Sequence, residues 1–250
     1  MQSFRFNREF RDSNHLESRL MKTIGILGGM SAASTQIYYR ELCSRTRERL
    51  GGLHSPELLI RSLDFAEIEA LQRAGKWKQA GEILNREAKA LERGNADFII
   101  LATNTMHKLA NQIMHGVSIP MLHIADATAA RIQQQGLRSP GLMATAFTME
   151  QPFYTERLVT ADLTPIIPET PDRAETHRII YEELCCDVMT KKSEATYVAI
   201  AQRLVDSVAD CLILGCTEVG MLLNQCNMSV PVFDTTLVHC DAALTMALGE

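Results

Sequence analysis

Short apolar runs alternate along the chain with longer segments in which apolar residues recur every three or four positions. The short runs predict strands at residues 23–29, 57–65, 97–103, 120–125, 141–145, 165–169, 211–217 and 230–235. The longer segments predict helices at residues 31–50, 66–75, 77–94, 104–114, 126–136, 150–159, 173–189, 194–209 and 218–224, followed by a terminal helix. Because most of these strands are apolar throughout, the pattern indicates an α/β fold with parallel sheets covered on both faces.

The chain also repeats itself at an offset of about 113 residues. Residues 97–104 (DFIILATN) align without a gap on residues 210–217 (DCLILGCT). Two further pairs follow the same order, residues 118–122 with 229–233 and residues 25–29 with 141–145. Together they predict two similar α/β halves related by duplication. Ligands of open parallel sheets bind outside the carboxyl ends of the strands, so Thr103 and Cys216 are expected at equivalent strand ends across one cleft.

The composition narrows the class of protein. The chain has 250 residues, of which 46% are hydrophobic and 22% charged, and its formal net charge is -5. These values are typical of a soluble globular protein, and an acidic chain is a poor candidate for non-specific nucleic-acid binding. No apolar run approaches the roughly 20 residues that a membrane-spanning helix requires. Neither nucleic acid nor a membrane is therefore expected as a partner.

Seven cysteines indicate a reducing compartment. Their number is odd, no secretory signal precedes them, and no CxxC spacing points to a zinc ribbon or a thioredoxin-like site. We expect a cytoplasmic location, with Cys185 and Cys186 partly buried in a helical run. Residues 1–20 are polar and are expected to form an extension outside the fold, with a partner-binding arm as the alternative.

Cys216 is the cysteine whose position favours reactivity, because it ends a strand where a helix is predicted to begin. A helix N-terminus carries free N–H groups and partial positive charge, which lower a cysteine pKa from about 8.5. The same N–H groups, with Asn104, Thr105 and Thr217, could hold a carboxylate. The alternatives are a small buried residue at position 216 and ordinary helix caps at the other three.

Six motifs, taken in order, resemble the cofactor-independent aspartate/glutamate racemase superfamily, with aspartate racemases and the bacterial enzymes acting on both L-aspartate and L-glutamate as the closest likeness. They read KTIGILGGMS, GGLHSPELLIRSLDF, ATNTMHKLA, PMLHIADAT, FTMEQPFY and GCTEVGMLL. The resemblance implies two similar parallel-sheet α/β domains with the active site in the cleft between them. It places residues 21–120 and 229–250 in the first domain and residues 121–228 in the second.

The resemblance also implies the reaction, which is racemisation of an acidic amino acid, aspartate first and glutamate second. Such a reaction needs a base on one face of Cα and an acid on the other, and Cys216 and Thr103 take these roles by position. Neither pyridoxal phosphate, another cofactor nor a metal is expected, and a homodimer is implied. The motifs further assign donors that would stabilise a carbanionic transition state: Gly29, Met30, Asn104, Thr105, Thr145 and Thr217.

Position 103 departs from the commonest pattern of the superfamily, which has cysteine at both strand ends. A threonine hydroxyl is a far weaker acid than a thiol, but some relatives with threonine there are racemases favouring the L-substrate. We therefore expect asymmetric catalysis, in which Cys216 serves one enantiomer readily. Thr103 would serve the other face, relayed by water or by His107.

The remaining assignments stay open at this point. His107 could tune Thr103 or simply be a packed histidine, and Glu218 could hold the substrate ammonium or favour a helix start. The side-chain carboxylate of the substrate needs a cation or several donors, for which Gln72, Arg61 and Arg73 are candidates. A lysine expected in archaeal aspartate racemases near residues 182–187 is missing from this sequence.

Two other functions compete with the racemase. A single cysteine in the second half also fits arylmalonate-type decarboxylases, and a non-catalytic protein could retain a dicarboxylate-binding cleft. A dinucleotide site is not supported, because residues 25–29 give GxxGG and not GxGxxG.

Overall fold

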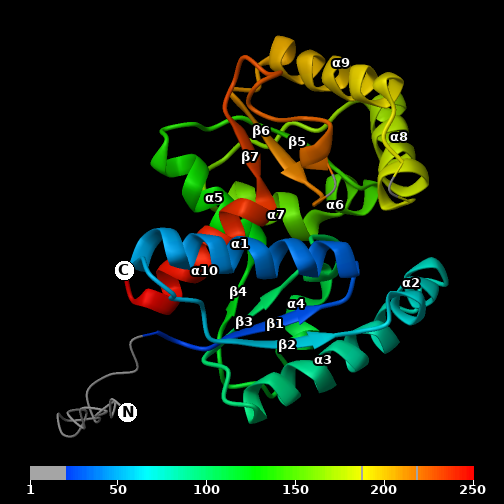
Figure 1. The fold of residues 1–250 in the computed structure, drawn as a ribbon. Coiled ribbons are helices and arrows are strands. Elements are labelled where there is room, and N and C mark those ends of the chain that lie inside the picture. Colours follow the sequence, from blue (N-terminus) through cyan, green and yellow to red (C-terminus); the bar gives the residue numbers. More distant parts are fainter. Residues whose placement is uncertain (1–20, 187, 218) are drawn as a thin grey trace, which may run out of the picture.

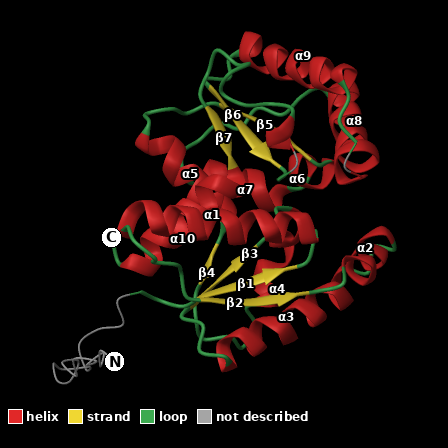
Figure 2. Ribbon diagram, viewed as in Figure 1, coloured by secondary structure: helices red, strands yellow, loops and turns green. Residues whose placement is uncertain are grey.

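The computed structural model describes residues 21–186, 188–217 and 219–250, which form two β-sheets flanked by helices (Figure 1). Residues 1–20, expected to form an extension, lie outside the described residues, as does Glu218. One sheet has the strand order β2-β1-β3-β4 and the other the order β5-β6-β7. Every strand pair in these sheets is parallel, which confirms the predicted α/β fold class (Figure 2).

The elements alternate along the chain much as the apolar pattern predicts. The elements from the first strand to the last strand of the first sheet are β1 (Ile24–Gly28), α1 (Ala32–Leu50), β2 (Leu58–Ser62), α2 (Phe65–Arg73), α3 (Trp77–Arg93), β3 (Phe98–Leu101), a 3₁₀ helix (Thr105–Leu109), α4 (Ala110–Ile113) and β4 (Met121–Leu122). The next are α5 (Ile124–Gln134), β5 (Pro140–Ala144), α6 (Ala146–Glu150), α7 (Pro152–Thr160), α8 (Thr170–Arg178), a π-helical turn (Ile179–Glu183) and a 3₁₀ turn (Leu184–Cys186). The last are α9 (Lys191–Ser207), β6 (Cys211–Gly215), a 3₁₀ turn (Val219–Met221), β7 (Val232–Asp234) and α10 (Thr235–Leu248).

The sequence repeat is visible in the hydrogen bonds at the start of each half. The Asp97 backbone N–H donates to the Thr23 carbonyl at 2.9 Å, and its carboxylate accepts from the Thr23 N–H at 2.6 Å. Asp210 makes the same reciprocal pair with Ser139, at 3.0 Å in each direction. The two aspartates therefore fasten β3 to β1 and β6 to β5 in the same way.

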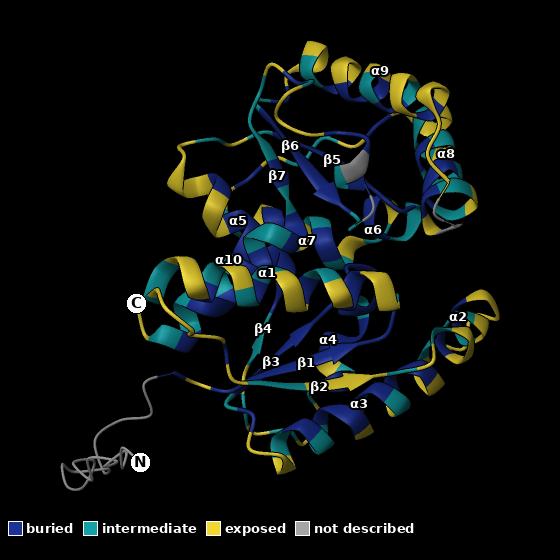
Figure 3. Ribbon diagram, in the orientation of Figure 1, coloured by how far each residue is buried: buried dark blue, intermediate teal, exposed yellow. Residues whose placement is uncertain are grey.

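Both sheets have apolar cores on both faces, as the unbroken apolar strands predict. Every residue of β1, β3, β5 and β6 is buried (Figure 3). The edge strand β2 is the exception, because its last three residues are exposed. The equivalent edge of the second sheet, predicted as a strand at residues 165–169, is reduced to one parallel bridge between Ile166 and Gly141.

Two helices cross from one half to the other. α5 directly follows β4 of the first sheet, yet its apolar residues pack in one core with β5 and β6 of the second sheet. α10 directly follows β7 of the second sheet, yet it packs with α1, β1 and β3 of the first. The two crossing helices contact each other, and they lie with α1 and α7 between the sheets (Figure 1).

The crossings shift the expected boundaries of the halves. The sequence-based division assigns residues 121–122 to the second half and residues 229–234 to the first. In the structure β4 pairs with β3, and β7 pairs with β6. Backbone pairing therefore keeps each last strand with its own sheet, and the chain changes halves only at the following helix.

Candidate active site

A small cavity of about 130 Å³ lies where strands of both sheets end. Thr103 follows β3, Cys216 follows β6, and both line this cavity, as expected of repeat-related strand ends. Eight of the predicted site residues line it: Met30, Gln72, Thr103, Asn104, Thr105, Thr145, Cys216 and Thr217. Gly29 and His107 lie beside it without lining it.

Gly29 shapes the turn that carries Met30 into the cavity wall. Its φ is 88°, which favours glycine, and a Cβ there would lie 2.2 Å from the Leu63 carbonyl oxygen. The Gly29 N–H donates to the Thr35 hydroxyl at 2.7 Å. Gly29 was expected as a donor to the transition state, but its N–H is used within the fold and the residue does not line the cavity.

His107 is hydrogen-bonded to the backbone of Thr103. Its Nδ1 lies 2.8 Å from the Thr103 carbonyl oxygen, and its Nε2 accepts from the Ile124 N–H at 3.3 Å. Because a carbonyl oxygen only accepts, Nδ1 carries the proton and the ring is neutral. Burial, and after it the neighbouring His123 and His239, hold the His107 pKa well below its usual value. Both ring nitrogens are engaged, so His107 positions the Thr103 backbone and does not relay its proton.

Asn104 presents an unsatisfied acceptor at the cavity. The residue is 5% exposed, and its Nδ2 donates to the Thr235 hydroxyl at 3.1 Å. Its Oδ1 is buried and has no hydrogen-bond partner among the described residues. An unpaired buried acceptor costs about 1–3 kcal/mol, so this oxygen is suited to accept from a donor on a bound ligand.

Hydroxyl groups join the two halves across the cavity. Thr105 and Thr145 approach each other with their side-chain oxygens 3.4 Å apart, and Thr145 lies 3.3 Å from the Thr148 hydroxyl. All three side chains are buried. They provide rotatable donors that can turn toward negative charge on a ligand.

The segment after each strand end differs from the expected helix start. Cys216 leads into a 3₁₀ turn of three residues, Val219–Met221, where a helix over residues 218–224 was predicted. Thr103 likewise leads into the 3₁₀ helix Thr105–Leu109 before the four-residue α4. Such short elements carry little macrodipole, so activation of Cys216 by a long helix is not supported.

Cys216 instead packs against the core of the second half. It lies against a cluster that includes the buried Tyr197 of α9. Burial, followed by the proximity of Cys216, raises the Tyr197 pKa well above its usual value. Burial also raises the pKa of the Cys211 and Cys240 thiols, which makes these two thiols unreactive at neutral pH.

Sequence reasoning missed eight residues that also line the cavity: Ser31, Ser34, Phe65, Glu69, Ile180, Tyr181, Cys185 and Gly215. Cys185 was expected to be partly buried in a helix, but it is exposed and follows a π-helical turn. Ser34 donates to the Ala102 carbonyl at 2.9 Å, which ties α1 to the end of β3. A signal for Ser31 and Ser34 existed in the motif after Gly29, whereas nothing marked the segment that carries Tyr181 and Cys185.

The charge of the lining is unusual for a dicarboxylate site. Among the described lining residues Glu69 is the one charged side chain, and Arg73 pairs with it at 2.6 Å. Arg61, the other candidate cation, is held by Glu87 of α3 and does not line the cavity. Any negative charge bound here would therefore be met by hydroxyl, amide and backbone donors.

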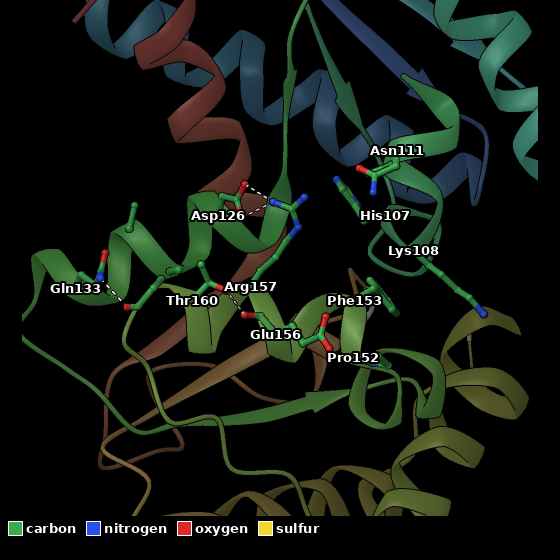
Figure 4. Close-up of a pocket in the computed structure, with 14 residues that line it drawn as sticks. His107, Lys108, Asn111, Asp126, Gln133, Pro152, Phe153, Glu156, Arg157 and Thr160 are labelled. Atoms are coloured by element: carbon green, nitrogen blue, oxygen red, sulfur yellow. Dashed lines mark hydrogen bonds and ion pairs between the residues drawn. The ribbon is translucent and has the colours of Figure 1, made fainter. Parts of the chain in front are cut away.

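A larger cavity of about 800 Å³ is lined by His107 and by side chains of α5 and α7 (Figure 4). Arg157 and Lys108, which line this cavity, already interact with other side chains of the protein. Arg157 donates to both carboxylate oxygens of Asp126, at 2.9 and 2.6 Å, and the Lys108 ammonium lies 4.0 Å from the Trp77 ring centroid. Neither Thr103 nor Cys216 lines this larger cavity.

His107, His123 and His239 form a cluster of buried histidines, and the protonation of His123 can be tested. Its Nδ1 caps α5 by accepting from the Ala125 N–H at 3.2 Å, and burial, then Arg157, lower its pKa from 6.5 to about 4. The unfolded chain therefore binds more protons than the folded one between pH 6.5 and 4, and the free energy of unfolding falls as the pH drops through this window. His123→Asn keeps a capping acceptor without this titration.

We expect wild type to lose stability relative to His123→Asn as the pH falls, by up to about 1.4 kcal/mol per pH unit. Urea unfolding of both proteins at several pH values between 7.5 and 4 measures this difference. Parallel pH profiles for the two proteins would contradict the assignment.

In the part of the chain that the structure describes, no helix is long and apolar enough to cross a membrane. The described side chains likewise include no group of three histidine, cysteine or acidic residues arranged to hold a metal ion.

Comparisons with known proteins identify the family of the chain. The sequence pattern of the Asp/Glu/Hydantoin racemase family matches residues 27–243. A candidate Asp/Glu racemase from Yersinia pestis is 44% identical, with a TM-score of 0.87 over 91% of this chain and 100% of its own. An aspartate racemase homologue from Pyrococcus horikoshii is 34% identical, with a TM-score of 0.81 over 92% and 100% of the two chains. The broad-specificity amino-acid racemase RacX of Bacillus subtilis is 22% identical over 85% of this chain and 92% of its own. On this evidence the chain belongs to the Asp/Glu/Hydantoin racemase family.

Proposed function

We propose that the protein racemises an acidic amino acid, aspartate before glutamate, by removing and returning a proton at Cα without a cofactor. Cys216 and Thr103 act on opposite faces of the substrate. The observation that carries the proposal is that these two repeat-related strand ends line one small cavity. A base and an acid on opposite sides of one carbon are what inversion requires.

The reaction conserves protons if the two residues are linked. The Cys216 thiolate takes the Cα proton, and the Thr103 hydroxyl gives its proton to the other face. Water then carries a proton from the Cys216 thiol to Thr103, because both nitrogens of His107 already have partners. Each turnover thus restores the starting protonation states.

The polar groups of the cavity match the remaining parts of an amino acid. The buried Asn104 Oδ1, which has no partner in the part of the chain that the structure describes, accepts from the substrate ammonium. The Thr105, Thr145 and Thr217 hydroxyls face the carboxylate, on which negative charge grows as the proton leaves. No described cation lines the cavity for a side-chain carboxylate, so aspartate and glutamate would rely on neutral donors for that group.

Deuterium exchange tests the proposal. In D2O a racemase places deuterium on Cα and moves the optical rotation toward zero. We would use L- and D-aspartate and L- and D-glutamate, with a neutral amino acid such as alanine added because the relative RacX is of broad specificity. Release of CO2 from an arylmalonate would indicate a decarboxylase instead. Thermal stabilisation by aspartate without exchange would indicate a binding protein.

Thr103→Cys is expected to even out the two directions of the reaction. A thiol with a pKa near 8.5 is a much better proton donor and acceptor than a threonine hydroxyl. Since two enantiomers are equally stable, kcat/KM must be equal in both directions, and any asymmetry is confined to kcat and KM separately. The ratio of kcat from the L- to kcat from the D-substrate should move toward one in the variant. A ratio equal to that of wild type would remove Thr103 from its assigned role.

A further inference from the structure

Thr235 stands where the chain returns from the second half to the first. It is the first residue of α10, directly after β7, and its side chain is fully buried. It does not line the cavity. Nothing in the reaction proposed above requires a threonine at this position.

Its hydroxyl nevertheless bridges the two strand ends that carry the proton-transfer residues. The Asn104 amide nitrogen donates to Thr235 Oγ1 at 3.1 Å, and Thr235 Oγ1 donates to the Leu214 carbonyl at 2.8 Å. Asn104 is adjacent to Thr103, and Leu214 lies two residues before Cys216. A hydroxyl can accept and donate at once, which an apolar side chain of the same shape cannot do.

We infer that Thr235 is a positioning residue that fixes the separation of Thr103 and Cys216 across the cavity. The inference rests on the proposed function, because it concerns the geometry of the two proton transfers. Catalytic groups must be held within a fraction of an ångström of productive geometry, and a displacement of about 1 Å can cost on the order of 100-fold in rate. A single buried hydroxyl that links both strand ends is suited to this task.

The role has a specific consequence for the fate of the carbanion. With both groups in place, a proton removed by Cys216 is replaced from the opposite face by Thr103, and the product is inverted. If Thr103 shifts away, Cys216 returns a proton to the face from which it took one. In D2O such an event leaves deuterium on the recovered substrate without inversion.

The test compares Thr235→Val, which keeps the shape and removes the hydroxyl, with Thr235→Ser, which keeps the hydroxyl. For the amino acid on which wild type is active, we would measure deuterium in recovered substrate and inverted product over the first few per cent of reaction. Thr235→Val should raise the ratio of exchange to inversion on the order of tenfold, and Thr235→Ser should restore it. Thr46→Val is the matched control, because Thr46 is also fully buried but its hydroxyl bonds only to Leu42 of its own helix, at 2.7 Å.

The outcomes separate this inference from the proposed function. If wild type shows neither exchange nor inversion on any amino acid tested, the proposed function fails. If wild type racemises and Thr235→Val lowers exchange and inversion in equal proportion, Thr235 is merely structural and the inference is overturned. An unchanged ratio at an unchanged rate would overturn it as well. Urea unfolding of both valine variants shows whether they are folded under the assay conditions.

Discussion

Cys216→Ala should abolish inversion of every substrate that the wild-type protein racemises, and deuterium exchange at Cα of the enantiomer from which Cys216 takes the proton. A positioned general base contributes roughly 10²–10⁴-fold to a proton transfer, and alanine offers no group that could take the proton. Either enantiomer requires Cys216 once per turnover, as base for one and as acid for the other. The loss should therefore appear in both directions of inversion, measured by optical rotation alongside exchange.

Two other cysteines provide comparisons for Cys216→Ala. Cys226 is exposed and does not line the cavity, so Cys226→Ala should behave as wild type. Cys185 does line the cavity, and Cys185→Ala asks whether a second thiol rather than Thr103 serves the opposite face. A loss as deep as that of Cys216→Ala would transfer the second role to Cys185. Full activity of Cys216→Ala would refute the role of Cys216.

Gly29→Ala should lower the free energy of unfolding by about 3–5 kcal/mol, combining the strain of a positive φ with the cost of overpacking. The added Cβ would lie 2.2 Å from the Leu63 carbonyl oxygen and 2.3 Å from the Leu63 nitrogen. These are backbone atoms, so relief requires the segment after β2 to move. For a chain of this size, each kcal/mol corresponds to roughly 2–4 °C in Tm.

Gly51→Ala separates the strain of a positive φ from the cost of overpacking. Gly51 has a similar φ of 74°, but nothing lies within 4 Å of its added Cβ. With φ 74° and ψ -175°, Gly51 lies in a backbone region used almost only by glycine, so we expect this variant to lose only the cost of the strained backbone, about 1–3 kcal/mol. Equal losses for Gly29→Ala and Gly51→Ala, measured by urea unfolding, would show that the contact with Leu63 relaxes without cost.

The fold could be predicted well because its signals are local. Short segments of sequence determine the unbroken apolar strands, the helical periodicity and the repeat. The repeat alone predicted that Thr103 and Cys216 lie at one cavity. The edge at residues 165–169 was less predictable, since a strand there depends on a partner and Ile166 makes only a single bridge. The helix expected at residues 218–224 is a 3₁₀ turn at Val219–Met221, in a segment whose Val219, Leu222 and Leu223 are buried in the core of the second half.

The candidate site was predictable where it coincides with strand ends and not elsewhere. Tyr181 and Cys185 reach the cavity because the chain leaves α8 through a π-helical turn, and helical periodicity cannot anticipate that change of phase. From its spacing to Thr103, His107 was expected either to tune or relay Thr103 or to be a packed histidine. The direction of its ring is fixed instead by the Ile124 N–H, a group distant from it in sequence.

The crossing of α5 and α10 means that each half covers part of the other half's sheet. One face of the first sheet is covered partly by α10, which follows β7, and one face of the second partly by α5, which follows β4. Either half alone would therefore leave apolar sheet surface exposed, because the helix that covers it follows the last strand of the other half. Such an exchange of identical elements between two chains is domain swapping. The chain thus has the arrangement of a swapped dimer joined into one chain, and its cavity lies where strands of both halves end.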